Sequence, residues 1–327
     1  MTERALEHIG VFTSGGDSPG MNAAIRAVVR TAVHHGLRVT GFRGGYDGMV
    51  NDRTVELGAR DVSNIIQRGG TILRSARCAA FMKPEGRTMA KETLDRHGIQ
   101  ALVAIGGDGT FAGAMKLHEE HGVRTIGLPG TIDNDLAGTD ASIGYDTALN
   151  TAIGAIDRIR DTASSHDRLF FVEVMGRDTG TLALACAVAA GAEYVMVPEK
   201  KEGIDELVRA LSTAAQSKSS SIVVIAEGDE EGGAFDVARK VKERFTHYDT
   251  RVAVIGHMQR GGQPTARDRI IASRSGVAAV EALLQGNANL MIGVSDGEIT
   301  RIPFDKAIHK KKDLDEDLYR VLQILAT

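Results

Sequence analysis

Short apolar runs alternate along the chain with stretches in which apolar residues recur at helical spacing. This alternation is typical of α/β proteins, in which strands and helices follow one another. Strands are predicted at residues 9–12, 37–42, 101–105, 124–128, 169–175, 194–197, 221–226 and 252–255, and helices at 21–32, 111–120, 148–162, 182–190, 204–215, 234–245, 266–284 and 313–325. Because the run at 101–105 is entirely apolar, it is predicted to be a central strand of a parallel sheet.

Composition narrows the class of protein. A chain of 327 residues is long enough for about two domains. Its 43% apolar and 25% charged residues are ordinary for a globular protein. The net charge of -4 provides no general attraction to nucleic acid or to anionic lipid. No nucleic-acid or membrane partner is therefore expected.

Two further features favour a cytoplasmic location. The first eight residues are polar and contain no apolar core of a secretion signal, and the longest apolar stretch, 181–192, is short for a membrane span and ends at Glu193. The two cysteines, Cys78 and Cys186, lack metal-ligand spacing and are expected to be reduced thiols.

Glycine clusters follow two of the predicted strands. Gly15-Gly16 comes after the first strand and just before a helix, where backbone N–H groups and the helix dipole can bind an anion. The segment is neither a P-loop nor a dinucleotide fingerprint, and a plain tight turn is the alternative. The segment 106–110, Gly-Gly-Asp-Gly-Thr, follows another strand and occurs in several kinase families. Its carboxylate, Asp108, is placed to hold Mg²⁺ on a bound polyphosphate.

A second candidate for chemistry is the segment 128–135, Leu-Pro-Gly-Thr-Ile-Asp-Asn-Asp, which follows the strand at 124–128. Its two carboxylates, Asp133 and Asp135, repel one another unless a cation or a proton separates them. One of them is suited to act as a base and the other to lie near a metal ion. The alternative is an Asx-rich turn that hydrogen-bonds its own backbone.

Six segments, in the same order along the chain, resemble the motifs of the 6-phosphofructokinase family. They are residues 10–26, 69–77, 106–110, 129–135, 172–180 and 256–262. The resemblance extends from about residue 10 to about residue 284, and more loosely to the C-terminus. It implies an ATP-dependent enzyme of glycolysis that phosphorylates fructose 6-phosphate.

The resemblance also implies an architecture. Family members have two doubly wound, mostly parallel sheet domains with a substrate cleft between them. Carried over, the nucleotide-binding domain would hold residues 1–140 and 257–303, and the sugar-phosphate-binding domain residues 141–256 and 304–327. Family members of this length are usually homotetramers whose active sites are shared between subunits.

Catalytic roles follow from the same motifs. Asp133 would be the general base, Asp135 would orient it and help the metal site, and Thr131 would hydrogen-bond the substrate. Arg77 would contact the transferred phosphate and Arg177 would stabilise it in the transition state, because a guanidinium binds phosphate bidentately. The remaining sugar-phosphate contacts would come from Arg168, Met175, Gly176, Glu227, Arg251, His257 and Arg260, of which Arg168 and Arg251 would reach the sugar 6-phosphate from a neighbouring subunit.

The nucleotide side is assigned in the same way. Contacts to ATP are expected from Gly16, Tyr46, Arg77, Cys78, Arg87, Gly106, Gly107, Asp108, Gly109, Thr110 and Gly113, with Asp108 binding Mg²⁺. Pyrophosphate-using relatives usually carry Asp and Lys where this chain has Gly109 and Gly130, so ATP is predicted as the donor. An effector site would involve Arg26, Arg30, Arg158, Glu193 and Lys218. The chain departs from the family at Ala59-Arg60 and Gln216, which weakens the case for a nucleotide effector.

Three alternatives remain open at this point. The nearest is a pyrophosphate-dependent enzyme of the same family. A kinase of NAD or of a lipid is a second, although residues 131–135 and 256–262 speak against it. The third is a non-catalytic sugar-phosphate sensor, which would be expected to have lost Asp133, Asp108 or Arg177.

Overall fold

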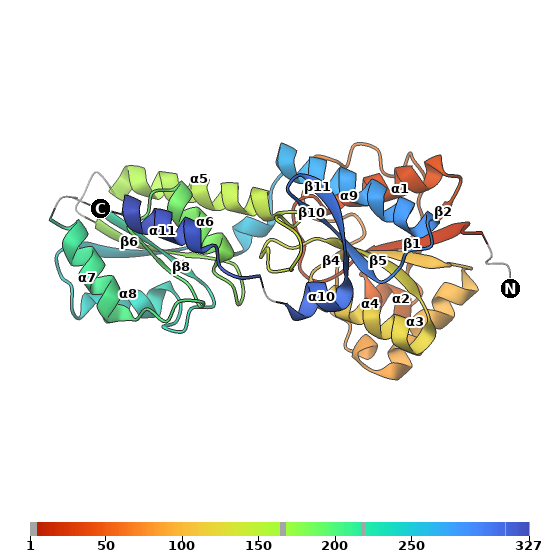
Figure 1. Cartoon of the computed structure of the whole chain (residues 1–327), viewed down its shortest axis with the longest axis horizontal. Helices are drawn as coiled ribbons and strands as arrows, with labels where there is room; N and C mark the ends of the chain where they lie inside the picture. The colour runs from red at the N-terminus through yellow and green to blue at the C-terminus, as the bar shows by residue number, and fades with distance from the viewer. Residues whose placement is uncertain (1–4, 164–167, 217–219, 311, 327) are drawn as a thin grey trace. The chain divides into compact units, whose positions relative to one another are not determined.

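The computed structural model describes residues 5–163, 168–216, 220–310 and 312–326. The chain forms two compact units, each with its own parallel sheet (Figure 1). Unit 1 consists of Met1–Ile132, Leu136–Thr147 and Arg260–Lys311, and unit 2 of Asp133–Asp135, Ala148–Gln259 and Lys312–Thr327. The α/β prediction is confirmed.

The sheet of unit 1 has seven strands in the order β11-β10-β5-β4-β1-β2-β3. The five inner strands are parallel, and β3 and β11 pair antiparallel at the two edges. The strands are β1 (His8–Thr13), β2 (Arg38–Phe42), β3 (Thr54–Glu56), β4 (Ala101–Gly106), β5 (Arg124–Pro129), β10 (Leu290–Ser295) and β11 (Glu298–Pro303). β4 lies between β1 and β5 and is buried throughout, as its apolar sequence predicts.

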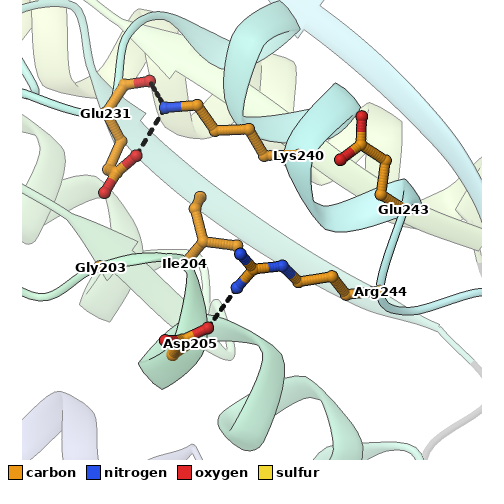
Figure 2. Close-up of a pocket in the computed structure, with 7 residues that line it drawn as sticks. All are labelled: Gly203, Ile204, Asp205, Glu231, Lys240, Glu243 and Arg244. Atoms are coloured by element: carbon orange, nitrogen blue, oxygen red, sulfur yellow. Dashed lines mark hydrogen bonds and ion pairs between the residues drawn. The ribbon is translucent and has the colours of Figure 1, made fainter.

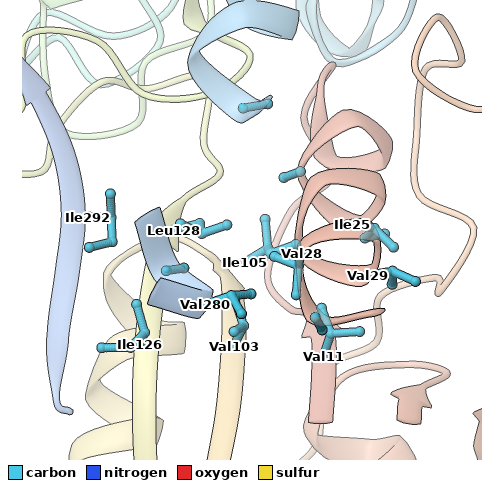
Figure 3. Packing of buried hydrophobic residues seen from close by; sticks show 14 of the residues in the cluster. Val11, Ile25, Val28, Val29, Val103, Ile105, Ile126, Leu128, Val280 and Ile292 are labelled. Atoms are coloured by element: carbon cyan, nitrogen blue, oxygen red, sulfur yellow. The ribbon is translucent and has the colours of Figure 1, made fainter. Parts of the chain in front are cut away.

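Helices cover both faces of this sheet, because alternate residues of its strands are apolar on each side. Val103 and Ile105 of β4 pack with α1 (Met21–His34) and α9 (Ala266–Leu284) in one core cluster, part of which Figure 3 shows. Leu102 and Ala104 pack on the opposite face. That face is covered by α2 (Tyr46–Val50), η1 (Ala80–Met82), α3 (Pro84–Arg96) and α4 (Asp108–His121).

Unit 2 contains a four-stranded parallel sheet in the order β7-β8-β6-β9. Its strands are β6 (Arg168–Val174), β7 (Tyr194–Met196), β8 (Ser221–Ala226) and β9 (Asp249–Val254). One face packs on α7 (Ile204–Ala214) and α8 (Ala234–Lys242), through a core that includes Phe171 and Leu207. Figure 1 shows α5 (Tyr145–Ala163), α6 (Thr181–Ala189) and α11 (Glu316–Leu325) on the other face.

The structure adds elements that the apolar pattern did not predict, namely β3, β10, β11, α2, α3 and α10 (Phe304–His309). It also places residues 304–310 in unit 1, whereas the expected division assigned them to the second domain. The reason is packing, because Phe304 is buried and stacks on Phe111 of α4 with ring centroids 5.0 Å apart. The division into two domains with the expected boundaries stays a prediction. None of the helices in the described ranges is long and apolar enough to span a membrane.

Candidate active site

Two glycine-rich loops leave the same edge of the unit 1 sheet. β1 and β4 are neighbouring parallel strands, so the loops that follow them lie together. The Ser14 amide donates to the Ile105 carbonyl oxygen at 3.0 Å, which joins the two loops directly. β2 lies on one side of β1 and β4 on the other, so the strand order reverses at this point. Open α/β sheets bind their ligands at such a reversal.

The second loop opens α4. Gly107 is the N-cap residue, and Asp108 supplies a carboxylate in the first turn of a 14-residue helix. The bare amides of this turn can bind phosphate oxygens. Gly109 is exposed, and a Cβ built on it would meet no atom within 4 Å. Gly106 is different, because a Cβ there would lie 2.3 Å from the Thr110 hydroxyl oxygen.

Tyr46 packs closely against the first turns of α4, where it meets Gly113. The Tyr46 hydroxyl donates to the Thr110 carbonyl oxygen at 2.6 Å, and its ring stacks on Phe81 at 3.9 Å. A Cβ on Gly113 would approach the Tyr46 ring to 2.8 Å. Burial raises the pKa of Tyr46, so the hydroxyl keeps the proton that it donates. Tyr46 therefore fixes the helix N-terminus from a buried position.

Arg260 lies over the first glycine loop. Its Nη1 donates to the Asp17 carbonyl oxygen at 3.2 Å, and a Cβ on Gly16 would lie 2.5 Å from the same nitrogen. All three residues belong to unit 1. The structure thus places Arg260 beside the glycines expected to bind the nucleotide, although the family motif suggests a contact with the sugar phosphate.

Arg77 ends the segment 69–77 on the surface of unit 1, and Cys78 follows it. Arg77 is exposed and Cys78 is partly exposed. The second cysteine, Cys186, is buried in α6, and burial raises the pKa of its thiol to about 12. Only Cys78 is therefore placed to meet a ligand in solution.

The Arg87 side chain is bound by Glu120 and by the backbone of Phe81. Its guanidinium makes a bidentate ion pair with Glu120, with both N–O distances 2.7 Å, and a third bond to the Phe81 carbonyl oxygen at 2.9 Å. The Glu120 carboxylate raises the pKa of Arg87, and the Arg87 guanidinium lowers the pKa of Glu120. The buried side chain of Arg87 thus joins α3 to α4, and its expected contact with the nucleotide stays a prediction.

The candidate base follows β5, on the other side of β4. The Gly130 amide donates to the Gly106 carbonyl oxygen at 3.0 Å, so this loop begins beside the second glycine loop. Thr131 is buried, and its carbonyl oxygen accepts from the Ser142 hydroxyl at 2.6 Å. The chain then passes into unit 2, where Asp133 is 5% exposed and Asp135 is partly buried.

Three loops of unit 2 leave the carboxyl edge of its sheet. β6 lies between β8 and β9, and all three strands are parallel. Residues 175–177 follow β6, Glu227 follows β8 directly, and His257 lies in η2 (Gly256–Arg260) after β9. The sugar-side residues expected from separate motifs therefore gather at one edge. Arg177 is exposed there.

The structure does not bring Arg168 and Arg251 to that edge. Arg168 is the first residue of β6, opposite Asp249, and its Nε lies 3.9 Å from the Asp249 carboxylate. Arg251 pairs with the same carboxylate at 2.5 Å. Both lie towards the amino end of strands whose carboxyl ends carry residues 175–177 and His257.

The expected effector residues are only partly available to a ligand. Burial, together with nearby Arg30, lowers the pKa of Arg26, and the Arg30 guanidinium reaches the Ala59 carbonyl oxygen at 3.5 Å. Glu193 is buried and accepts from the Ile222 amide at 2.6 Å, and its expected part in an effector site stays a prediction. Arg158 donates to a carbonyl oxygen of its own helix, and Lys218 lies outside the described residues.

Another pocket lies beside α7 and α8 (Figure 2). Its volume is about 370 Å³, and it is lined by Gly203, Ile204, Asp205, Glu231, Lys240, Glu243 and Arg244. Lys240 pairs with Glu231 at 2.6 Å, and Arg244 pairs with Asp205. Because its cations are satisfied by neighbouring carboxylates, this pocket does not compete with the loop edges as a phosphate site.

Known proteins resemble this chain along nearly its whole length. The phosphofructokinase family model matches residues 8–283. The chain is 54% identical to the "ATP-dependent 6-phosphofructokinase 2" of Bacteroides thetaiotaomicron, over 97% of this chain and 98% of that one. It is also 54% identical to the "ATP-dependent 6-phosphofructokinase 1" of Thermus thermophilus, over 98% of this chain and 100% of that one.

Solved structures of phosphofructokinases also resemble this chain. The Pichia pastoris phosphofructokinase in the T-state superposes with a TM-score of 0.87 and 36% identity, over 94% of this chain. This chain spans 36% of the length of that larger one. The matched motifs, the two α/β units and the identity to bacterial relatives lead to one conclusion: the chain belongs to the phosphofructokinase family.

Proposed function

We propose that the protein transfers the γ-phosphate of ATP to the C1 hydroxyl of fructose 6-phosphate, giving fructose 1,6-bisphosphate and ADP. The observation that carries the proposal is the 54% identity, over 98–100% of their lengths, to bacterial proteins named as ATP-dependent 6-phosphofructokinases. The arrangement of glycine loops in unit 1 and of sugar-side residues in unit 2 supports it.

ATP is assigned to unit 1. Its phosphates would lie on the adjoining loops after β1 and β4, with Gly16, Gly106, Gly107, Gly109 and Thr110 providing close backbone approach. Arg77 and Cys78 would contact the nucleotide from the surface, and Tyr46 and Gly113 would act by fixing the first turn of α4. Arg260 would add a positive charge over the glycine loop.

Asp133 is assigned as the general base. A sugar hydroxyl does not ionise at neutral pH, so a carboxylate within hydrogen-bond reach must accept its proton as the new O–P bond forms. Thr131 would orient the hydroxyl and Asp135 would orient Asp133. Arg177 would neutralise charge on the phosphoryl group, where a guanidinium fork matches two oxygens.

Unit 2 is assigned to the sugar phosphate. Met175, Gly176, Glu227 and His257 gather at the edge where Arg177 lies, and would contact the sugar. Arg168 and Arg251 lie towards the other end of the strands, which supports the expectation that they serve a neighbouring copy. The proposed assembly is a homotetramer, and a cytoplasmic location remains a prediction.

Asp108 suits a magnesium ion carried by the nucleotide. Its carboxylate lies in the first turn of α4 beside the phosphate loop, and Mg²⁺ takes one or two protein carboxylates with phosphate oxygens completing its shell. Within the described ranges no three His, Cys, Asp or Glu side chains form a metal-binding group, which fits an ion held largely by substrate. When bound, such an ion would reduce the negative charge of the phosphates.

The choice of donor can be tested at Gly109. We expect Gly109→Asp to fold normally, because a Cβ at this exposed position meets no atom and the backbone φ is not positive. The added carboxylate would repel the ATP phosphates, and like charges in contact cost several kcal/mol, so kcat/KM for ATP should fall at least about 100-fold. Steady-state kinetics with ATP varied measure the effect.

Gly109→Asn is the matched control, since it adds nearly the same volume without a charge. It should retain more activity than Gly109→Asp by about tenfold or more. Unchanged ATP kinetics in Gly109→Asp would refute the placement of the nucleotide.

The second glycine at which pyrophosphate-using relatives differ, Gly130, is already crowded, because a Cβ there would lie 3.0 Å from Ile105.

A coupled assay of fructose 1,6-bisphosphate formation tests the proposal itself. With MgATP and fructose 6-phosphate we expect turnover, and with pyrophosphate in place of ATP we expect less than about 1% of that rate, since discrimination of a few kcal/mol corresponds to such a ratio. Greater activity with pyrophosphate would support the alternative donor. Binding of fructose 6-phosphate with no turnover on either donor would indicate a sensor.

Control by the usual bacterial effectors is expected to be weak. Glu193 is committed to the Ile222 amide, and Ala59 provides neither a charge nor a ring for a nucleotide. Titration with ADP or phosphoenolpyruvate should therefore shift the half-saturating fructose 6-phosphate concentration by less than about threefold, or under 1 kcal/mol of coupling. A shift of tenfold or more would show a working effector site despite these losses.

A further inference from the structure

The loop that carries Arg177 has an unusual backbone. Gly176 has φ 154° and Arg177 has φ 57°, directly after the end of β6. A non-glycine residue in the left-handed region persists only where its surroundings hold it. The direction of the Arg177 side chain therefore depends on what fixes this backbone.

Two acceptor side chains bind three successive amides of the loop. The Met175 amide donates to Gln259 Oε1 at 2.9 Å. The amides of Gly176 and Arg177 both donate to Glu227 Oε1, at 3.3 Å and 2.8 Å. All five residues belong to unit 2, so the arrangement is internal to one compact unit. We name these contacts the amide clamp.

Close packing supports the loop on its other side. A Cβ on Gly228 would lie 2.1 Å from the Arg177 carbonyl oxygen, so only glycine allows this approach. The Gly176 carbonyl oxygen accepts from both the amide and the hydroxyl of Thr179, each at 3.1 Å. The backbone is thus held from both sides.

Gln259 acts only through the loop. It is 0% exposed, so its side chain is out of reach of a ligand in solution. Because Met175 presents a donor, the Gln259 amide must turn its oxygen towards it. The family motif at 256–262 contains Gln259, but sequence analysis assigned it no role.

We propose that Gln259 is a positioning residue: by accepting the Met175 amide in the amide clamp, it holds Arg177 in the orientation needed for phosphoryl transfer. Glu227 shares this task in addition to its proposed contact with the sugar. The kinetic part of this inference rests on the proposed function, whereas the clamp itself does not.

Hydrogen–deuterium exchange of the full-length protein tests the clamp without any activity. Gln259→Met keeps the side-chain length but removes the acceptor, and Gln259→Asn keeps the amide but is too short to reach. In either variant the Met175 amide should exchange about tenfold faster than in the wild type, with exchange in α7 and α8 unchanged. Gln259→Glu keeps an acceptor oxygen and should restore protection. Wild-type protection in Gln259→Met or Gln259→Asn would overturn the proposal.

Gln100→Met is a matched control. Gln100 Oε1 also accepts two backbone amides, those of Glu7 and His8 at 2.7 and 3.0 Å, but it lies in unit 1. Gln100→Met should leave both the exchange rate of the Met175 amide and kcat within about twofold of the wild type, because Gln100 and the two amides that it binds are not part of the amide clamp. A similar effect at both glutamines would indicate general loosening and count against the proposal.

Kinetics distinguish positioning from general damage. Gln259→Met should lower kcat about 10- to 100-fold, as small misplacements of catalytic groups do, while KM for ATP stays within about twofold. In an Arg177→Ala background the same change should lower kcat by less than about twofold further, because the group being positioned is gone. If the losses of kcat caused by Gln259→Met and by Arg177→Ala multiply in the double variant, the proposal is overturned. If the wild type has no kinase activity, the proposed function fails, and exchange alone then decides on the clamp.

Discussion

Asp133→Asn is expected to lower kcat by about 10²- to 10⁴-fold, the usual contribution of general acid–base catalysis. Asparagine has the same shape and can still accept a hydrogen bond, but it cannot take a proton from the sugar hydroxyl. Because Asp133 is 5% exposed, the neutral amide should be tolerated at this buried position. Steady-state kinetics should show KM for fructose 6-phosphate changing by less than about tenfold, since the lost interaction belongs to the transition state.

Asp140→Asn provides the matched control for Asp133→Asn. Asp140 is exposed and accepts from the Ser295 hydroxyl and the Asp296 amide, at 3.1 and 2.8 Å, in unit 1. The control should retain kcat within about twofold, because surface substitutions rarely affect distant groups. A fully active Asp133→Asn variant would exclude Asp133 as the base.

Arg177→Ala is expected to lower kcat by about 10³-fold or more, the range found when an arginine that neutralises a transferring phosphoryl group is lost. Arg177 is exposed, and its backbone amide donates to Glu227. Arg177→Lys should recover part of the loss, because it restores the charge but not the fork. Single-turnover measurements would separate this chemical step from product release.

Arg244→Ala is the control for Arg177→Ala. Arg244 is an exposed arginine of unit 2 that pairs with Asp205 of α7. Its loss should change kcat by less than about twofold, since exposed ion pairs contribute little. If Arg177→Ala were no more damaging than Arg244→Ala, Arg177 would have no part in the transfer.

The apolar pattern predicted the buried strands well, for a physical reason. β1, β4 and β8 are buried along their whole length, so their sequences are mostly apolar. The pattern missed β11 because that edge strand is partly exposed and carries Glu298, Thr300 and Arg301. α3 was also missed, since its sequence is mostly polar and only Ala90 and Leu94 supply buried apolar side chains.

The surroundings of individual site residues could not be predicted, because they depend on contacts between residues far apart in the sequence. The motifs located the loops at the ends of β1, β4, β5, β6 and β9, because parallel strands end at one edge of a sheet. The ion pair of Arg87 with Glu120 could not be predicted, because the two residues lie 33 positions apart in the chain. The burial of Glu193 against Ile222 could not be predicted either, because it depends on how β7 and β8 pair. Gln259 was overlooked because its role depends on accepting one backbone amide.

A crystal structure of the protein with fructose 6-phosphate and a non-hydrolysable ATP analogue with Mg²⁺ tests the central claim most directly. The account predicts an Asp133 carboxylate oxygen about 2.6–3.2 Å from the C1 oxygen of the sugar, with Arg177 on the γ-phosphate. Asp133 would be excluded as the base if both ligands were bound productively and its carboxylate were too far from the C1 oxygen to reach it directly or through one bridging water molecule.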